Sequence, residues 1–402
     1  TTMLQYIDAS MVGSMGAQAS ASIGLMETTM WLLGSICSAA AAGFYVQVSH
    51  QLGSNDPARA RNTLRQGIMS VLVVSALIGL VSLAVSPFLP VWLGGGSDIT
   101  PTASAYFAIV ATALPIFQFS IFGAGMLRTS ANLAVPTAMR VVRMSPDVVS
   151  TRFLTSPTRP VQLFGAEVTI PGMGMGVVGA AIGTVSAELV AASITMYILC
   201  FRSKELSLRI DTGRFLPTWG VVKRALHISL PMGLQQTIMC SAYVMTTIII
   251  APLGTFAIAA NSFGVIVESL CYMPGYGIAD AATTLVGQSI GAGRHELMKR
   301  FAWLSVGLGV TVMAVMGVVM YVGAPVAMAM MTPAEEVRRL GVEVLRIEAF
   351  AEPMFAAAIV SYGVFVGAAK TLVPSIMNLV SIWGVRISLA ALLAPSMGLR
   401  GV

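Results

Sequence analysis

Charged side chains are scarce in this sequence. Lys, Arg, Asp and Glu make up 10% of the 402 residues, while apolar and aromatic residue types make up 56%. Soluble globular domains carry about a quarter charged residues. So few charges cannot cover that much apolar surface in water, which excludes a soluble fold. The sequence predicts an integral membrane protein.

Motifs of catalytic and metal-binding proteins are also missing. The four cysteines lie within apolar runs and none forms a CxxC pair, so neither a disulfide framework nor a metal site is expected. There is no GxxxxGK[ST] motif for ATP, and no nucleophile–base set or metal triad. Residues 174–179 match GxGxxG but open a predicted span, where Gly179 and Gly183 favour close helix packing. We therefore predict no enzyme activity and no cofactor.

Long apolar runs are what the chain has in abundance. A helix needs about 20 apolar residues to cross the bilayer core. Residues 1–12 are interpreted as the end of one span, and the runs are continuous, which predicts an all-α integral membrane protein instead of a β-barrel. Ten further spans are predicted at 22–46, 64–92, 102–126, 134–156, 176–201, 228–250, 258–284, 301–328, 340–366 and 372–394.

The net charge of +6 is interpreted as an orientation signal and not as a nucleic-acid footprint. If the spans alternate, 14 of the 23 Lys and Arg residues, including Arg61 and Arg65, fall in loops on one side of the membrane. The positive-inside rule places that side in the cytoplasm. We expect a multi-pass protein of the cell (inner) membrane that is in contact with the lipid bilayer and does not bind nucleic acid.

One short motif occurs twice. VQVSHQLGSN at 46–55 and TLVGQSIGAG at 284–293 place Gly53 and Gly291 238 positions apart. The same offset joins further pairs: Pro115 and Pro353, Pro136 and Pro374, and Gly125 and Gly363. A constant offset over so long a stretch indicates an internal duplication. Because each repeat holds six spans, both halves have the same topology, as in parallel-repeat transporters.

The duplication predicts two pseudo-symmetric six-helix bundles, with twelve transmembrane helices in the intact protein and about eleven represented here. The N-terminal bundle takes residues 1–201, with its first helix truncated. A cytoplasmic linker takes 202–224, and the C-terminal bundle, without its last helix, takes 225–402. Two similar bundles with a seam between them suit alternating access.

Several stretches resemble one known family. They are YIDASMVGSMGAQASASIG (6–24), HQLGSNDPARA (50–60), PLGTFAIAANSFG (252–264), MPGYGIADAATTLVGQSIGAGR (273–294) and GVFVGAAKTLVPSIMN (363–378). Together they are similar to the multidrug and toxic compound extrusion (MATE) family, along nearly the whole chain. The resemblance implies a secondary antiporter that exports drugs, xenobiotics or cationic metabolites in exchange for H⁺ or Na⁺. We expect the protein to be a monomer.

Acidic residues at membrane depth are the candidates for ion coupling, because a buried carboxylate is costly unless it binds a proton or a cation. Asp8 matches an aspartate of the family's first helix, and Asp147 one of its fifth helix. Glu268 lies two turns after Asn261, so both could line the cavity of the second bundle. Na⁺ could bind at Asp8 or at Glu268.

The fifth helix departs from the family pattern. Arg143 stands where the family commonly has asparagine, and its spacing from Asp147 is i, i+4, so the two could pair and weaken coupling. Arg140 and Arg152 lie on the same segment. A basic cavity is the mark of an alternative function, a flippase or exporter of lipid-linked saccharides or another amphipathic substrate.

The remaining candidates lie in the second half of the chain and at two prolines. Gln235 is one of two glutamines in the seventh helix, where some family members carry a glutamate. Glu348 and Glu352 share a helical face and could contact substrate, although Arg346 could neutralise either. Pro115 and Pro353 occupy matching positions, where each could bend its helix.

Overall fold

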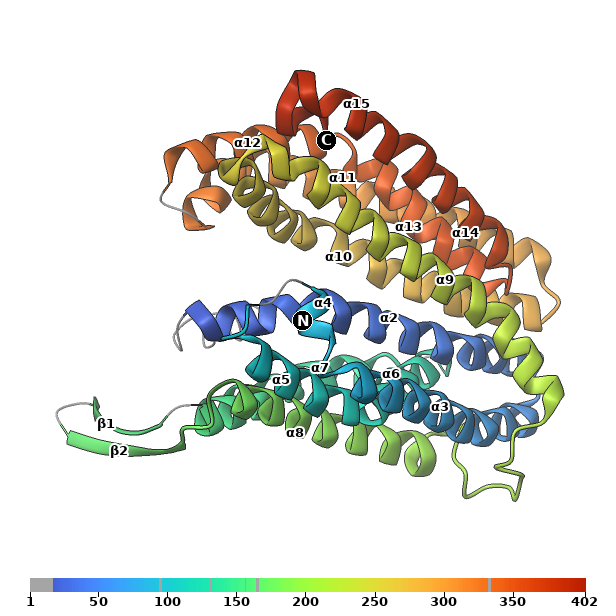
Figure 1. Cartoon of the computed structure of the whole chain (residues 1–402). Coiled ribbons are helices and arrows are strands. Elements are labelled where there is room, and N and C mark those ends of the chain that lie inside the picture. Colours follow the sequence, from blue (N-terminus) through green and yellow to red (C-terminus); the bar gives the residue numbers. More distant parts are fainter. Residues whose placement is uncertain (1–16, 94–95, 131, 156, 164–165, 332–333) are drawn as a thin grey trace. The chain divides into compact units, whose positions relative to one another are not determined.

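The computed structural model describes residues 17–402, apart from 94–95, 131, 156, 164–165 and 332–333 (Figure 1). All regular elements of these residues are helices apart from one hairpin, and the helical membrane fold is confirmed. Asp8 lies outside the described residues. Contacts divide the chain into two compact units. The first holds the described residues up to Val48 together with Asp56–Ser229, and the second holds Ser49–Asn55 and Leu230–Val402.

The first unit contains the helices of the first half of the chain. They are α2 (Ala17–Gly53), α3 (Pro57–Val85), α4 (Leu89–Trp92), α5 (Thr100–Thr112), α6 (Leu114–Thr129), α7 (Ala134–Thr155), α8 (Gly176–Tyr197) and η1 (Ile198–Arg202). The last turn of α2 belongs to the second unit. Asp56 caps α3 by accepting a hydrogen bond from the Arg59 amide at 3.0 Å, and Pro57 occupies the first helical position.

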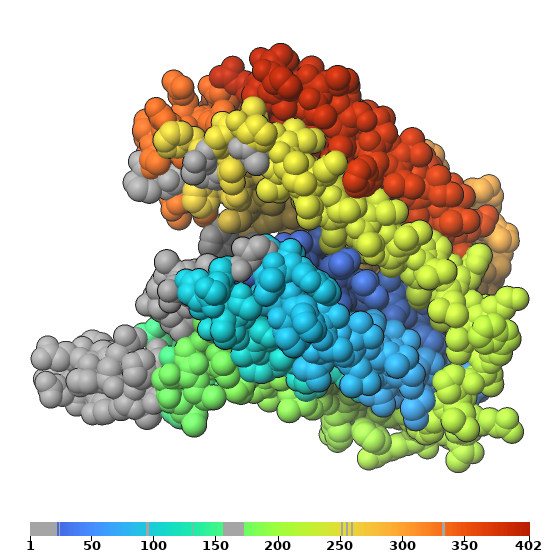
Figure 2. Space-filling view, in the orientation of Figure 1, coloured from blue at the N-terminus to red at the C-terminus, as the bar shows by residue number. Residues whose placement is uncertain are grey.

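The second unit contains the remaining helices. They are α9 (Trp219–Ile250), which begins in the first unit, η2 (Ala251–Leu253), α10 (Thr255–Gly291), α11 (His295–Met331), α12 (Glu335–Glu348), α13 (Glu352–Gly367), α14 (Leu372–Leu379), η3 (Val380–Ile387), α15 (Ser388–Met397) and η4 (Gly398–Gly401). Large apolar side chains are exposed on α14, η3 and α15, the red surface in Figure 2. Such a surface suits contact with lipid.

Among the described residues, seven helices are long and apolar enough to cross a membrane, and two bent helix pairs raise the number to nine. The predicted span at 134–156 corresponds to α7, which does not qualify. Its residues Arg140, Arg143, Asp147 and Arg152 make it too polar for such an assignment. The other nine predicted spans each coincide with one of these helices or bent pairs.

The duplication is visible in the helix bounds. Helices α2 and α10 begin and end at positions that differ by the same 238 residues, and so do α6 and α13. Helices α5 and α6 meet at 48°, and α12 and α13 meet at 58°. Pro115 and Pro353 stand in the first turn after these two breaks, where proline costs no hydrogen bond. Each half of the chain therefore bends one span at the same place.

A two-stranded hairpin was missed by the sequence analysis. Strand β1 (Pro157–Leu163) pairs antiparallel with β2 (Ala166–Met173) between α7 and α8. Two prolines in β1 argue against a strand, since proline cannot donate to the ladder. An isolated hairpin tolerates them because both of its strands are edges.

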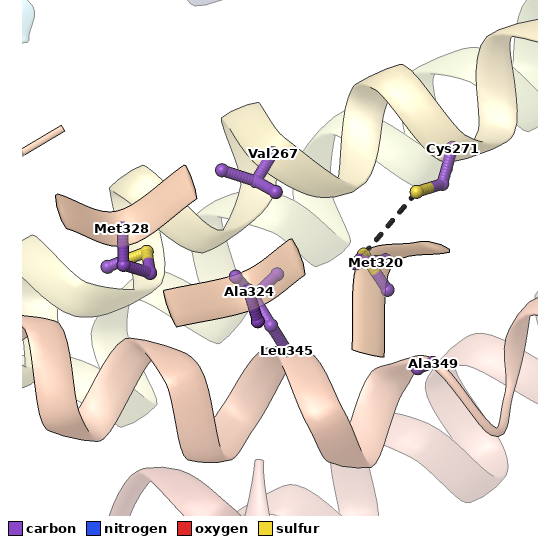
Figure 3. Close-up of a cluster of buried hydrophobic side chains, with 7 residues drawn as sticks. All are labelled: Val267, Cys271, Met320, Ala324, Met328, Leu345 and Ala349. Atoms are coloured by element: carbon purple, nitrogen blue, oxygen red, sulfur yellow. Dashed lines mark hydrogen bonds between the residues drawn. The ribbon is translucent and has the colours of Figure 1, made fainter. Parts of the chain in front are cut away.

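The core of the second unit rests on small and flexible side chains. Figure 3 shows a cluster in which Val267 and Cys271 of α10 pack against Met320, Ala324 and Met328 of α11, Leu345 of α12 and Ala349, the residue that follows α12. The thiol of Cys271 lies 3.5 Å from the Met320 sulfur. Val267 and Cys271 flank Glu268 along the helix, so this apolar contact fixes the part of α10 that carries the acid.

The linker between the two halves is fastened to the first unit. Arg61 donates from Nε to Asp211 at 2.6 Å and from Nη1 to the Glu205 carbonyl at 3.0 Å. Arg65 donates to the carbonyls of Leu208, at 3.1 Å, and Asp211. Both arginines are buried, so these two members of the basic set that the sequence assigns to one side of the membrane also hold a chain segment in place.

Candidate ion and substrate sites

Helices α7 and α8 approach closely through two glycines. A Cβ on Gly179 would lie 2.6 Å from the Leu154 carbonyl oxygen, and one on Gly183 would lie 2.7 Å from the Thr151 Cα atom. Any larger residue would push the helices apart. The small-residue spacing thus serves helix packing, as the sequence indicated, and it brings polar side chains of the two helices face to face.

A buried polar cluster occupies this contact. Arg143 of α7 forms an ion pair with Glu188 of α8 at 2.5 Å. Asp147 is fully buried; it accepts a hydrogen bond from the hydroxyl of Thr151 at 3.3 Å, and Thr184 of α8 lies close to its carboxylate. The expected pairing of Arg143 with Asp147 is therefore wrong as a direct contact, because Glu188 takes the guanidinium, although the charge of Arg143 still acts on Asp147.

The other two arginines of α7 do not join this cluster. Arg140 and Arg152 are exposed. Only Arg143, of the three, faces the interior of the first unit in an ion pair that the structure describes. The basic character of this helix is therefore divided between its buried face and its surface.

A second group of acids lies within the second unit. The charges of Glu268 on α10, Glu348 at the end of α12 and Glu352 at the start of α13 interact with one another. Arg386 of η3 opposes Glu268 and Glu348. Three carboxylates against one guanidinium leave an excess of negative charge when all are ionised, and Oε2 of Glu348 and of Glu352 has no hydrogen-bond partner among the described residues.

Aromatic rings lie near these acids. The ring of Tyr272 meets those of Tyr276 and Phe355 edge to face, with centroids 5.8 Å and 5.9 Å apart. Tyr243 of α9 interacts electrostatically with Glu268. Carboxylates and aromatic faces both attract organic cations. The group formed by Glu268, Glu348, Glu352, Arg386, Tyr243, Tyr272 and Tyr276 is called the acid–tyrosine cluster below.

The other predicted residues have different surroundings. Arg346 stacks over Tyr321, with 5.2 Å from its guanidinium carbon to the ring centroid, and donates to the Tyr321 carbonyl, so it does not neutralise Glu348 or Glu352. Gln235 is buried and accepts a hydrogen bond from Ser375 at 2.9 Å. Asn261 is half-buried on the same helix as Glu268.

The two repeated turns lie against each other in the second unit. A Cβ on Gly53 would lie 2.7 Å from the carbonyl carbon of Gln288, and one on Gly291 would lie 2.7 Å from that of His50. The two contacts are equivalent under the offset of 238, which relates Gly53 to Gly291 and His50 to Gln288. His50 also donates from Nε2 to the Gly367 carbonyl at 2.7 Å. The two copies of the motif therefore cross at this contact, and each provides a glycine to it.

The sequence places Glu188 among the acids at membrane depth, but we assigned it no role there, and sequence reasoning missed Arg386 and the tyrosines. Each stands in an apolar run, where Glu188 and Arg386 follow the same rule of costly intramembrane charge that singled out Asp147. Their pairing could not be predicted, because it joins helices that are distant in sequence. Tyrosine is common in membrane helices and gives no such signal.

A family model described as MatE matches residues 1–151 and 231–392. "Probable multidrug resistance protein NorM" of Thermotoga maritima is 25% identical over 390 residues, which cover 95% of this chain and 80% of that protein. The protein of the same description from Xanthomonas axonopodis pv. citri is 24% identical over 401 residues, covering 97% and 83%.

Solved structures share the fold. A multidrug resistance MATE family transporter of the MOP superfamily, in an outward-facing conformation, matches with a TM-score of 0.89 and 18% identity over 100% of this chain and 86% of that one. A MOP superfamily transporter from Pyrococcus furiosus, described as having a binding pocket of reverse polarity, matches at 0.87 and 18% with the same coverage. Because the family model spans most of the sequence, the chain belongs to the MATE family of membrane transporters, which are not enzymes.

Proposed function

We propose that this protein is a secondary antiporter that exports amphipathic cations across the inner membrane. The acid–tyrosine cluster carries this proposal, because it combines an excess of carboxylates, one of them buried and two half-buried, with aromatic rings. An organic cation is attracted by the carboxylates and stacks on the rings. The relatives named as multidrug resistance proteins support the same class of substrate.

We assign ion coupling to carboxylates in both halves of the chain. Asp147 and Glu268 are held in polar surroundings within their own units, and Asp8 joins them as the candidate of the first helix. A buried carboxylate either takes up H⁺ or supplies hard oxygen ligands to Na⁺. Release of that ion when an organic cation binds nearby would couple the two flows, since both compete for the same negative charge.

The matching bends provide points at which each half could change shape. The breaks before Pro115 and Pro353 lie at equivalent positions, and Glu352 stands directly at the second. A change in charge at Glu352 would therefore act at a helix break. We propose that the two bundles alternate access around these bends, with the protein working as a monomer.

The test is export of ethidium from vesicles that contain the full-length protein, under a pH gradient and a Na⁺ gradient imposed separately. We expect one gradient to drive export, and Glu268→Gln to reduce the rate about tenfold by removing a charge that binds the cation. Glu296→Gln, which removes an exposed carboxylate paired with Lys299 at 3.0 Å, is the matched control and should export normally.

The alternative function remains the movement of lipid-linked saccharides. The three arginines of α7, Arg140, Arg143 and Arg152, are the feature in its favour, since guanidinium groups bind the phosphates of such lipids. Absence of ethidium export under both gradients, together with movement of a lipid-linked saccharide lost in Arg140→Gln, would replace the antiporter proposal by this one.

A further inference from the structure

Arg143 lies within reach of two acids, and its choice between them matters. On α8 it contacts Glu188, whose side chain is 3% exposed. On its own helix it stands one turn before Asp147, the spacing at which an arginine and an aspartate pair. The contacts of α7 with α8 run in opposite directions along the two helices, from Leu154 with Gly179 to Arg143 with Glu188, so this alignment is fixed along the whole interface.

Charge balance decides what each choice does. Arg143 brings one positive charge, while Asp147 and Glu188 bring two negative charges when ionised. If Glu188 holds the guanidinium, Asp147 keeps its own charge for a proton or a monovalent cation. If the guanidinium moves to Asp147, a permanent cation neutralises that carboxylate, because arginine does not lose its proton in proteins.

The structure shows the first arrangement. Asp147 is fully buried, its Oδ1 accepts from Thr151, and its Oδ2 has no hydrogen-bond partner within the part of the chain that the structure describes. A buried acceptor without a partner is costly and calls for a ligand. Thr184, one turn before Glu188 on α8, places its hydroxyl close to the Asp147 carboxylate.

We propose that Glu188 is a positioning residue, which holds Arg143 away from Asp147 and so keeps Asp147 free to bind the coupling ion. This inference rests on the proposed antiport. It assigns the first unit an ion site at Asp147, next to the permanent positive charge of Arg143. Glu188 acts on the bound ion only through Arg143. Loss of Glu188 therefore harms coupling by releasing Arg143 and not by removing a ligand.

The first experiment measures how export of ethidium depends on the concentration of the ion that drives the wild-type protein. In Glu188→Gln we expect the half-maximal ion concentration to rise about tenfold or more, because Arg143 then competes with the ion for Asp147. In the double variant Arg143→Gln/Glu188→Gln the competitor is gone, and the value should return to within about threefold of wild type. Glu296→Gln again serves as the control.

A purely structural role for Glu188 would give a different result. It would lower the amount of folded protein and the Tm, while the folded fraction would keep the wild-type ion dependence, and that result overturns the proposal. A crystal structure of Glu188→Gln gives an independent answer: the guanidinium is expected on Asp147, and a guanidinium that stays beside Gln at position 188 also overturns it. If the wild-type protein exports nothing under either gradient, the antiport itself fails, and this inference with it.

Discussion

Valine at position 291 is expected to disrupt the crossing of the two repeated turns and to reduce export of ethidium about tenfold or more. The added side chain would overlap the backbone of His50, which cannot move aside as a flexible side chain can. Forcing bulk into such a contact costs about 1–3 kcal/mol, and more where backbone is displaced. The measurement is the Tm of the purified protein together with its export rate.

The pseudo-symmetry makes a stricter form of this prediction. Gly53→Val should have an effect similar to that of Gly291→Val, since its side chain would meet Gln288 in the equivalent way. The double variant should lose less than the sum of the two single losses, because one substitution already separates the helix ends. Gly277→Val on α10 is the control, since Gly277 is exposed and has no atom within 4 Å of its Cβ position. A Gly291→Val protein with wild-type Tm and export would contradict the crossing.

The crossing shows what sequence could predict. The constant offset of 238 located the duplication, and the helix bounds of α2 and α10 repeat it residue for residue. The sequence did not indicate that the two copies touch. An offset compares positions within each half, whereas the contact of Gly53 with Gln288 depends on how distant helices meet in space.

The candidate sites were predicted in part for a similar reason. Intramembrane charge is detectable residue by residue, so Asp147, Glu268, Glu348 and Glu352 stand out in the sequence. Partners in sequence can be proposed only from nearby positions. The i, i+4 rule favoured Asp147 for Arg143, and closeness along the chain favoured a glutamate for Arg346. The actual neighbours are Glu188 and Tyr321, reached across helices. Local spacing thus identified the charges but not their pairing.

Replacement of Arg65 is expected to have the second large effect, a loss of stability together with release of the linker. Its side chain is 3% exposed and donates to two carbonyls of the linker, which itself has no regular secondary structure over residues 203–218. Hydrogen bonds from a charged donor contribute about 1.5–3 kcal/mol each, and Arg65→Leu removes both of them. Arg65→Leu is therefore expected to lower the Tm by several degrees and to release the linker from α3.

Limited trypsin digestion measures that release directly. Arg209 and Arg214 lie in the linker, and we expect cleavage there to become about tenfold faster in Arg65→Leu, because a loop must leave its attachment to enter a protease. Arg59→Leu removes an exposed arginine of the same helix and should leave the rate unchanged. Arg65→Lys should be cleaved at an intermediate rate, since lysine cannot reproduce the two directed bonds of a guanidinium.

Equal cleavage of Arg65→Leu and wild type would mean that Arg61 and Gln66, which accepts from Thr218 at 2.9 Å, hold the linker without Arg65. Faster cleavage in Arg65→Leu alone would show that an arginine placed on the cytoplasmic side by the positive-inside rule also fastens the connection between the two halves to one of them.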